Sequence, residues 1–202
     1  MYEKDPDSKT LIWLLIMLEP TRTKFYKYTD LDAPIFKGLY LDFTTMFDAL
    51  LVNGFNSKTP SAFTLLNNVL TITFPIAHGY NNYSVLKISN ADVPIYNREL
   101  RVRNVTQYTV DILVDETFTT VPTNPIEIII KHAPLGFTKK FEATGKRVYT
   151  NPNWDVAFKI DDYQHADWPA TWSRFARIQF ATDYSDVDTA LGYYYPIVDL
   201  TK

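Results

Sequence analysis

The hydrophobic pattern of the chain changes its period near residue 60, and this change limits the folds that the chain can adopt. From Asp42 to Asn53, large apolar residues recur at the spacing of an amphipathic helix. They are Phe43, Met46, Phe47, Leu50 and Leu51. Asp42 is predicted to cap the start of this helix, and Asn53-Gly54 to supply a left-handed stop. One face of the helix is apolar, so it must be covered.

From Ser61 onward, apolar and polar residues alternate as they do in β-strands. Phe63–Leu66 and Val69–Phe74 flank Asn67-Asn68, which predicts a hairpin. Further strands are expected at Tyr83–Ile88, Glu99–Arg103, Tyr108–Val114 and Ile126–Lys131, with turns at 89–92 and 104–107. Short antiparallel strands at this spacing predict a small barrel or sandwich over residues 61–132.

The C-terminal region, residues 133–202, is expected to form a second β-rich region that packs on the rest of the chain. Its predicted strands are Arg147–Thr150, Val156–Ile160 and Phe175–Thr182. Its aromatic residues include Trp154, Tyr163, Trp168, Trp172 and Tyr193–Tyr195. The predicted fold class is therefore mainly β with a minor α part. It comprises an antiparallel β-barrel or sandwich module, one short amphipathic helix and this second β-rich region.

Residues 1–32 precede these elements and contain the longest apolar run, Leu11–Leu18. A helix needs roughly 20 apolar residues to cross a bilayer, so no membrane span is predicted. The acidic residues before the run disfavour a secretion signal. Two alternatives remain for residues 1–32: a buried strand or short helix, or an arm that docks on a neighbouring subunit. Lys24–Tyr28 is predicted to be an edge strand that carries lysines, and residues 33–60 form the helix-containing segment.

The composition limits the classes of partner. The formal net charge is −3, which disfavours direct binding of nucleic acid. The absence of cysteine excludes disulfides, thiolate metal sites and a cysteine nucleophile. Aromatic residues make up 15% of the chain, and aromatic side chains dominate the energetics of cores and interfaces. This content is what we expect of a protein with large contact surfaces.

No pattern in the sequence predicts catalysis, a cofactor or a metal. His78, His132 and His165 have no metal-ligand spacing, so structural roles are expected for them. The acids of Asp183–Asp188 fall at the wrong positions for a calcium loop and predict a solvated turn. Asp161-Asp162 is expected to be a turn rather than half of a carboxylate pair. The sequence also lacks phosphate-binding glycine loops and a Gly-x-Ser-x-Gly motif.

Two stretches carry a resemblance to a known family. The first is Ala33-Pro34, then Gly38, then Phe47–Phe55, with Ala77-His78-Gly79 further on. The second is Ala133–Phe137 with Lys139 and Phe141, followed by Ala176-Arg177 and Ser185–Thr189. The chain resembles a family of tailed-bacteriophage virion structural proteins. In that family an Ala-Pro loop and a glycine precede a helix ending in Leu-Asp-Ala-x-Leu-Val-Asn-Gly-Phe. A β module with a His-Gly turn and a Gly-Trp-x-Lys-x-Phe element follow.

The resemblance implies a non-enzymatic structural subunit of a phage particle, assembled in the cytoplasm of the bacterial host. Its partners would be copies of itself and other virion proteins, in the tail, in the neck or on the head. The side chains predicted to lie at such interfaces are Leu11, Trp13, Leu14, Phe43, Phe47, Trp168, Trp172, Tyr193 and Tyr194.

Two other functions are kept as alternatives. The first is a carbohydrate- or receptor-binding module of a fibre or a capsid decoration protein, using Trp154, Trp168, Trp172 and Tyr193–Tyr195. The second is a hydrolase with an unrecognised site, which would need a cleft with strongly perturbed carboxylates. The sequence does not distinguish between the possible locations of a structural subunit in the particle.

Overall fold

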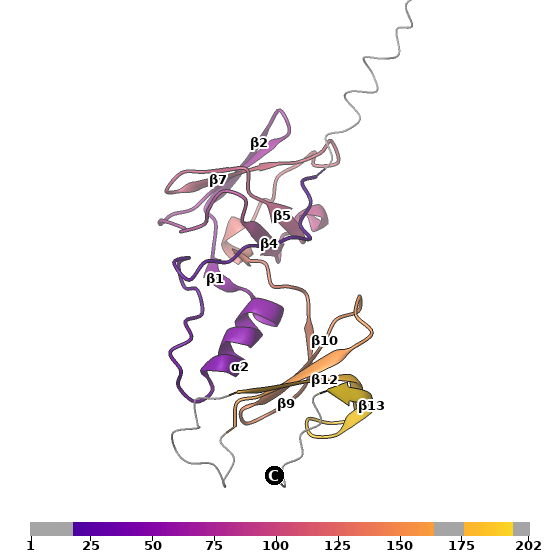
Figure 1. Ribbon diagram of the computed structural model, residues 1–202. Helices are drawn as coiled ribbons and strands as arrows, with labels where there is room; N and C mark the ends of the chain where they lie inside the picture. The colour runs from indigo at the N-terminus through magenta and orange to yellow at the C-terminus, as the bar shows by residue number, and fades with distance from the viewer. Residues whose placement is uncertain (1–17, 164–175, 196–202) are drawn as a thin grey trace, which may run out of the picture. The chain divides into compact units, whose positions relative to one another are not determined.

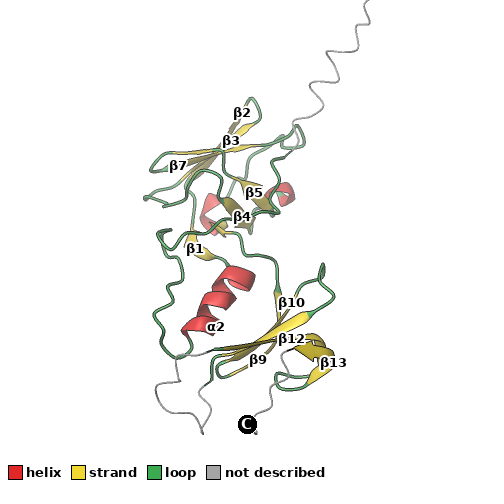
Figure 2. Ribbon diagram, viewed as in Figure 1, coloured by secondary structure: helices red, strands yellow, loops and turns green. Residues whose placement is uncertain are grey.

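The computed structural model describes residues 18–163 and 176–195, which form two compact units (Figure 1). Residues 18–31 and 56–132 make the first unit, and residues 32–55 and 133–195 make the second. The helix-containing segment thus belongs to the same unit as the C-terminal region. The fold is mainly β, with three antiparallel sheets and one short helical segment, as the sequence predicts (Figure 2).

The first unit is a sandwich of two four-stranded sheets. One sheet has the order β1-β8-β4-β5 and the other has the order β2-β3-β7-β6. The strands are β1 (Phe55–Lys58), β2 (Ala62–Leu66), β3 (Val69–Thr73), β4 (Val85–Ser89), β5 (Glu99–Arg101), β6 (Asn104–Val105), β7 (Thr109–Leu113) and β8 (Ile129–His132). Two short 3-10 helices, η3 (Pro94–Tyr96) and η4 (Pro125–Glu127), lie in the connections between the strands.

The core of this sandwich follows the alternation of the sequence. Leu70 and Ile72 of β3 are fully buried, and the residues that alternate with them along the strand are only partly buried. Leu86 and Ile130 contribute from the other sheet to the same apolar cluster. Because side chains alternate between the two faces of a strand, each sheet presents one apolar face to this shared core.

The hairpin predicted at Asn67-Asn68 is confirmed. Asn67 and Asn68 have φ angles of 50° and 61°, so both adopt the positive φ of a two-residue type I′ turn. β2 and β3 pair on either side of the turn, with Leu66 opposite Val69. Asparagine tolerates this backbone region better than most residues do, which is why the dipeptide marks the turn.

Two local predictions for the first unit are wrong. Residues 24–28, predicted to be an edge strand, form no strand. This segment is instead attached to the sandwich through a side chain, because Lys24 Nζ lies 2.9 Å from the carboxylate of Glu99 in β5. Residues 104–107, predicted to be a turn, begin with β6, which pairs with β7. The chain passes from one sheet to the other at the buried Val102, between β5 and β6.

The second unit packs a helix on a five-stranded antiparallel sheet of order β13-β12-β11-β10-β9. The strands are β9 (Thr138–Ala143), β10 (Lys146–Thr150), β11 (Ala157–Asp161), β12 (Arg177–Tyr184) and β13 (Ala190–Tyr195). The helix comprises an α-helical part, α2 (Asp42–Phe47), and a π-helical part, η2 (Asp48–Asn53). β9 and β13 were not predicted from the sequence. In the part of the chain that the structure describes, no helix is long and apolar enough to cross a membrane.

The helix predicted over 42–53 is confirmed in extent, and three of the five residues of its predicted apolar face, Phe43, Phe47 and Leu51, pack against the sheet. A π-helix pairs residues five apart, so η2 turns more slowly than the α-helical spacing assumes. As a result Val52 joins Phe43, Phe47 and Leu51 against the sheet. The helix ends at Gly54, which has a φ of 74° and whose N–H donates to the carbonyl oxygen of Ala49.

The predicted helix cap is also wrong. Leu41 is the N-cap residue, and the Asp42 carboxylate accepts the backbone N–H groups of Lys37 and Leu39 at 2.9 and 3.0 Å. In the first turn of the helix, the Phe43 N–H instead donates to the carboxylate of Asp162 at 3.1 Å. The first N–H groups of a helix have no acceptor within the helix, and here the residue that follows β11 supplies an acceptor for one of them.

Candidate functional site

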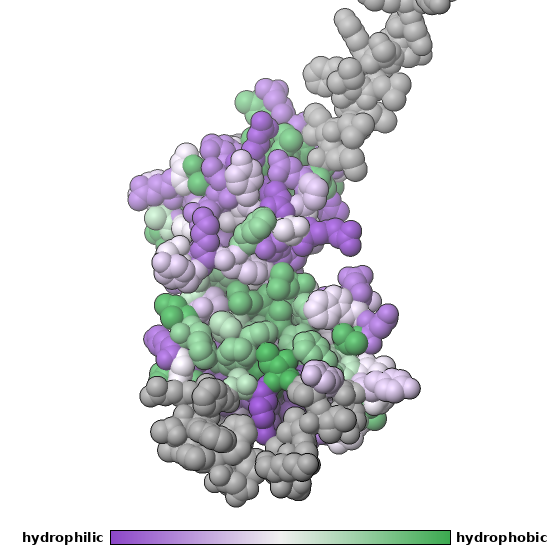
Figure 3. All heavy atoms as spheres, in the orientation of Figure 1, coloured by the Kyte–Doolittle hydropathy of each residue, from purple (hydrophilic) through white to green (hydrophobic). Residues whose placement is uncertain are grey.

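An apolar groove lies in the second unit, along the edge of the helix. Its volume is about 420 Å³, within the range of pockets that hold a small molecule or a few side chains. It is lined by Phe47, Leu51, Leu135, Phe137, Asn151, Trp154, Phe158, Ile178 and Phe180. On the face shown in Figure 3, hydrophobic residues gather over this helix and the sheet beside it. It is far larger than the pocket beside Asp30 and Asn81 in the first unit, whose volume is about 40 Å³.

The groove exists because the helix covers only part of the sheet. Tyr149 of β10 and Ile160 of β11 are fully buried on the helical side. On β12, which lies farther along the same face, Ile178 is 37% exposed and Phe180 is 45% exposed. Because Phe180 is the register partner of Phe158, the apolar surface continues without a break from the buried part into the exposed part.

The far wall of the groove is fixed to the helix by its backbone. The Leu135 N–H donates to the carbonyl oxygen of Leu50 at 2.9 Å, and the Phe137 N–H donates to that of Leu51 at 3.0 Å. The last carbonyls of a helix lack internal partners, so this segment satisfies two of them. Phe137 is thereby held against Trp154, with the two rings edge to face at 5.0 Å. The wall is therefore a rigid aromatic surface.

The chemistry of the groove is almost entirely apolar. Among the described residues that line it, Asn151 has the only amide side chain, and none has a carboxylate, an imidazole, a hydroxyl or a basic group. Trp154 is 50% exposed, so an aromatic ring is available to a partner. A saccharide site needs several placed hydrogen-bonding groups beside its aromatic rings. The lining matches a packed apolar partner better than a sugar.

Several charged side chains of the second unit outside the groove are paired with one another. Asp161 accepts a hydrogen bond from Arg177 Nη2 at 2.7 Å, and Lys159 and Lys146 both donate to Asp188 at 2.7 Å. Burial raises the pKa of Asp188, but the hydrogen bonds from the two lysines outweigh burial and leave that pKa below its ordinary value. These residues form a structural ion-pair network on the sheet.

The two acidic stretches singled out in the sequence have separate structural roles. Asp161 is the last residue of β11 and Asp162 follows it, and both are buried rather than placed in an exposed turn. Burial raises the pKa of Asp162, against the opposing effect of the Phe43 and Thr44 N–H groups. In the loop after β12, Asp186 accepts the N–H groups of Asp188 and Thr189. The described residues contain no cluster of three or more groups able to hold a metal ion.

The histidines that the structure describes lie in the first unit and are buried. His78 Nε2 bonds the Thr109 carbonyl at 3.2 Å, and its Nδ1 accepts the Tyr80 N–H at 2.9 Å, which is the pattern of a neutral ring. His132 lies edge-on to the Tyr80 ring at 5.3 Å. Burial lowers the pKa of both histidines. These are core positions.

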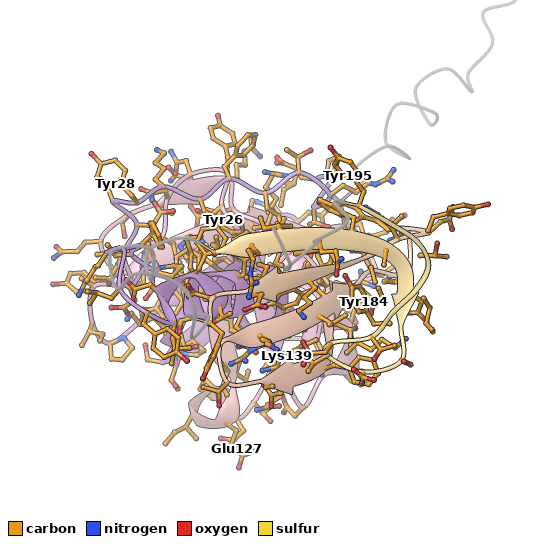
Figure 4. All side chains as sticks on the ribbon, turned by 60° about the horizontal axis from the view of Figure 1, so that its bottom comes forward. Tyr26, Tyr28, Glu127, Lys139, Tyr184 and Tyr195 are labelled. Carbon is orange, nitrogen blue, oxygen red and sulfur yellow. The ribbon has the colours of Figure 1, made fainter. Side chains whose placement is uncertain are left out.

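The structure brings only some of the predicted interface residues to the groove. Phe47 lines it, Phe43 packs beside Phe47 at 5.0 Å between ring centroids, and Tyr193 on β13 is 91% exposed. Tyr194 lies in β13 as well. Leu11, Trp13, Leu14, Trp168 and Trp172 lie outside the described residues. Near the end of β13, Tyr195 is exposed at the rim of the sheet (Figure 4).

The sequence did not single out Leu135, Phe158, Ile178 or Phe180 as site residues. The signal available was the pattern Ile178-x-Phe180, which places two large apolar residues on one face of a strand. Comparison of the chain with protein-family models, with curated proteins and with solved structures finds no match. The functional conclusion therefore depends on the groove and on the sequence motifs.

Proposed function

We propose that this chain is a non-enzymatic structural subunit that acts by packing against copies of itself and other proteins, in the particle of a tailed bacteriophage. The observation that carries the proposal is the exposed apolar groove of the second unit. Contiguous exposed apolar surface is rare on soluble proteins unless it meets a partner. Its aromatic lining is the composition that protein interfaces favour.

The resemblance and the groove share four residues, which supports joining them in one proposal. The first stretch that resembles the phage family contributes Phe47 and Leu51 to the groove. The second stretch contributes Leu135 and Phe137. In both, the residues around them fix the geometry: Gly54 ends the helix, and segment 135–137 bonds the last helical carbonyls. The motifs are thus the sequence signature of this surface.

Self-association is the first testable consequence. We expect the purified chain to form oligomers, and the double variant Ile178→Thr/Phe180→Thr to weaken their association by at least about tenfold, because central apolar contacts dominate interface energies. Threonine keeps a high strand propensity, so the fold of β12 is retained. Sedimentation velocity over a wide range of concentrations measures the effect, and circular dichroism checks the fold.

Phe25→Thr provides the matched control, because Phe25 is an exposed phenylalanine of the first unit, outside the groove. It should leave the association unchanged. A wild-type chain that sediments as a monomer throughout, or equal weakening by Phe25→Thr and by the double variant, would contradict the proposal.

The virion assignment has its own test. Particles purified by density gradient from cultures in which a phage encoding this chain multiplies should contain it as a stoichiometric component, detected by quantitative mass spectrometry of its peptides. Copy numbers that match a cyclic symmetry would support a place in a symmetric assembly. Recovery of the chain only in the soluble lysate fraction, away from the particles, would show that it is not a virion component.

A further inference from the structure

We propose that the groove of the second unit receives the apolar segment Leu11–Met17 of a second copy of this chain, so that copies are joined by exchanged N-terminal arms. The inference rests on the proposed function, since it takes the groove to be an assembly surface, and it names what fills it. In an assembly of identical chains, each groove is matched by one such segment, because every chain carries one of each. A reciprocal exchange between two copies closes a two-fold dimer, whereas donation of the arm from each copy to the next forms a ring or a filament.

The root of the arm is fixed on the first unit. Leu18 packs against the core of the sandwich. Arg101 of β5 donates from Nε to the Pro20 carbonyl at 2.7 Å and from Nη2 to the Thr23 carbonyl at 2.6 Å. Together with the Lys24–Glu99 pair, these contacts hold residues 18–24 on the first unit. The arm therefore starts from a defined point.

The docking segment adjoins the root of the arm. Leu11–Met17 ends directly before Leu18, and an extended chain advances by at most about 3.5 Å per residue, so the segment reaches at most roughly 25 Å from Leu18. The groove that receives it must therefore lie within this distance of the root, on a copy that packs directly beside the first unit.

The arm and the groove match in chemistry. Leu11–Met17 consists of seven consecutive large apolar residues, with Trp13 among them. The groove offers eight apolar side chains and Asn151, and its volume suits a few side chains rather than a whole helix. Exposure of either apolar surface to water is unfavourable, and docking of the arm in the groove removes both surfaces from water. Extended peptides commonly bind by placing alternate side chains in such pockets.

Docking of the arm on a second copy, rather than on its own, is what the proposed function requires. An arm that filled the groove of its own chain would cover the surface that joins subunits. Such a chain would be a monomer in which neither the arm nor the groove is exposed. Exchange between copies buries the same apolar surface and also builds the assembly.

Photo-crosslinking of the full-length chain tests the exchange. Unlabelled chain with p-benzoyl-phenylalanine in place of Trp13 is mixed with ¹⁵N-labelled wild-type chain, irradiated and digested. We expect crosslinks from position 13 to labelled peptides that contain Trp154 or Phe180. Crosslinks confined to unlabelled peptides of the same chain, or crosslinks that miss the groove, would overturn the inference.

Arm variants separate this inference from the proposed function. Trp13→Ser/Leu14→Ser should weaken self-association by at least about tenfold, as the groove variant does, whereas Asp5→Ser/Asp7→Ser in the same segment should leave it unchanged. If the groove variant weakens association and the apolar arm variant does not, the groove remains an interface and the arm is not its occupant. If neither variant changes association, the proposed function fails as well.

Discussion

Replacing Asp48 with alanine is expected to lower the free energy of unfolding of the second unit by about 3 kcal/mol. Asp48 begins η2 and lies over the sheet with little exposure. Its Oδ1 accepts the Tyr149 hydroxyl at 2.8 Å, and its Oδ2 accepts Arg147 Nε at 3.1 Å and Lys139 Nζ at 3.4 Å. One carboxylate thus joins the helix to β9 and β10. Its removal leaves a buried hydroxyl and a largely buried guanidinium without this acceptor.

The conservative substitution Asp48→Asn should have about half of that effect, because the amide oxygen still accepts one hydrogen bond but carries no charge. Burial, and then the hydrogen bond to Asp48, raise the pKa of Tyr149, so its hydroxyl is protonated and donates at neutral pH. Native-state hydrogen exchange of the β10 and β11 amides measures the local free energy of opening.

Asp183→Ala is the matched control for Asp48→Ala. Asp183 pairs with Lys140 in the same unit, at 2.6 Å, but about half of its side chain is exposed. Ion pairs of this kind contribute less than about 1 kcal/mol. If the two alanine variants lose similar stability, the Asp48 interactions are not what holds the helix on the sheet.

The elements that the sequence predicted correctly are those set by local interactions. The hairpin at Asn67-Asn68 depends on two residues that adopt positive φ and on the alternation beside them. The extent of helix 42–53 depends on a run of helical spacing that ends at Gly54. Such signals lie within a few residues of one another, so a single sequence contains them.

The elements that were missed depend on distant partners. β9 reads as polar, with Lys139 and Lys140 in its centre, and becomes a strand because it pairs with β10 at the edge of the sheet. β13 contains Gly192, which has a φ of 69° and approaches Thr182 closely beside the register shift of β12 and β13. The widening of the helix at Asp48 also moves its apolar face from Leu50 toward Val52.

The groove could not be predicted for a similar reason. Alternation shows that Phe158, Ile178 and Phe180 belong to one face of a sheet. It does not show how far helix 42–53, more than 100 residues earlier in the sequence, extends over that face. The exposed part of the face is a property of this packing, so an interface role could be predicted for Phe47 but its neighbours in the groove could not.

The largest expected effect of pH falls on the first unit, through His132. Its side chain is 1% exposed, and burial lowers its pKa to about 4, although the charge of Asp30 acts in the opposite direction. In the unfolded chain the pKa of histidine is about 6.5. Because the folded form binds the proton less well, its contribution is complete above pH 6.5 and is lost as the pH falls toward 4. The loss amounts to about 3 kcal/mol.

His78 acts in the same direction. Burial lowers its pKa, and protonation of its Nδ1 would remove the acceptor of the Tyr80 N–H. The Tyr80 hydroxyl in turn donates to the carbonyl oxygens of Asn56 and Ile130, so the ring between the two histidines is fixed from both strands β1 and β8. The free energy of unfolding of the sandwich should therefore begin to fall below pH 6.5, before most surface carboxylates titrate.

Urea unfolding at several pH values between 4.5 and 7.5 measures this dependence, with the methyl NMR signals of Leu86 and Ile130 reporting on the first unit. The wild-type free energy of unfolding should rise with pH by up to about 1.4 kcal/mol per pH unit for each histidine in this window. His132→Phe keeps an aromatic ring against Tyr80 but cannot be protonated. The free energy of unfolding of this variant should therefore rise less steeply with pH, and the difference from the wild type is the contribution of His132. His165 and the carboxylates are present in both chains and cancel in the difference. Equal slopes for the two proteins would mean that His132 is not the group whose burial opposes protonation.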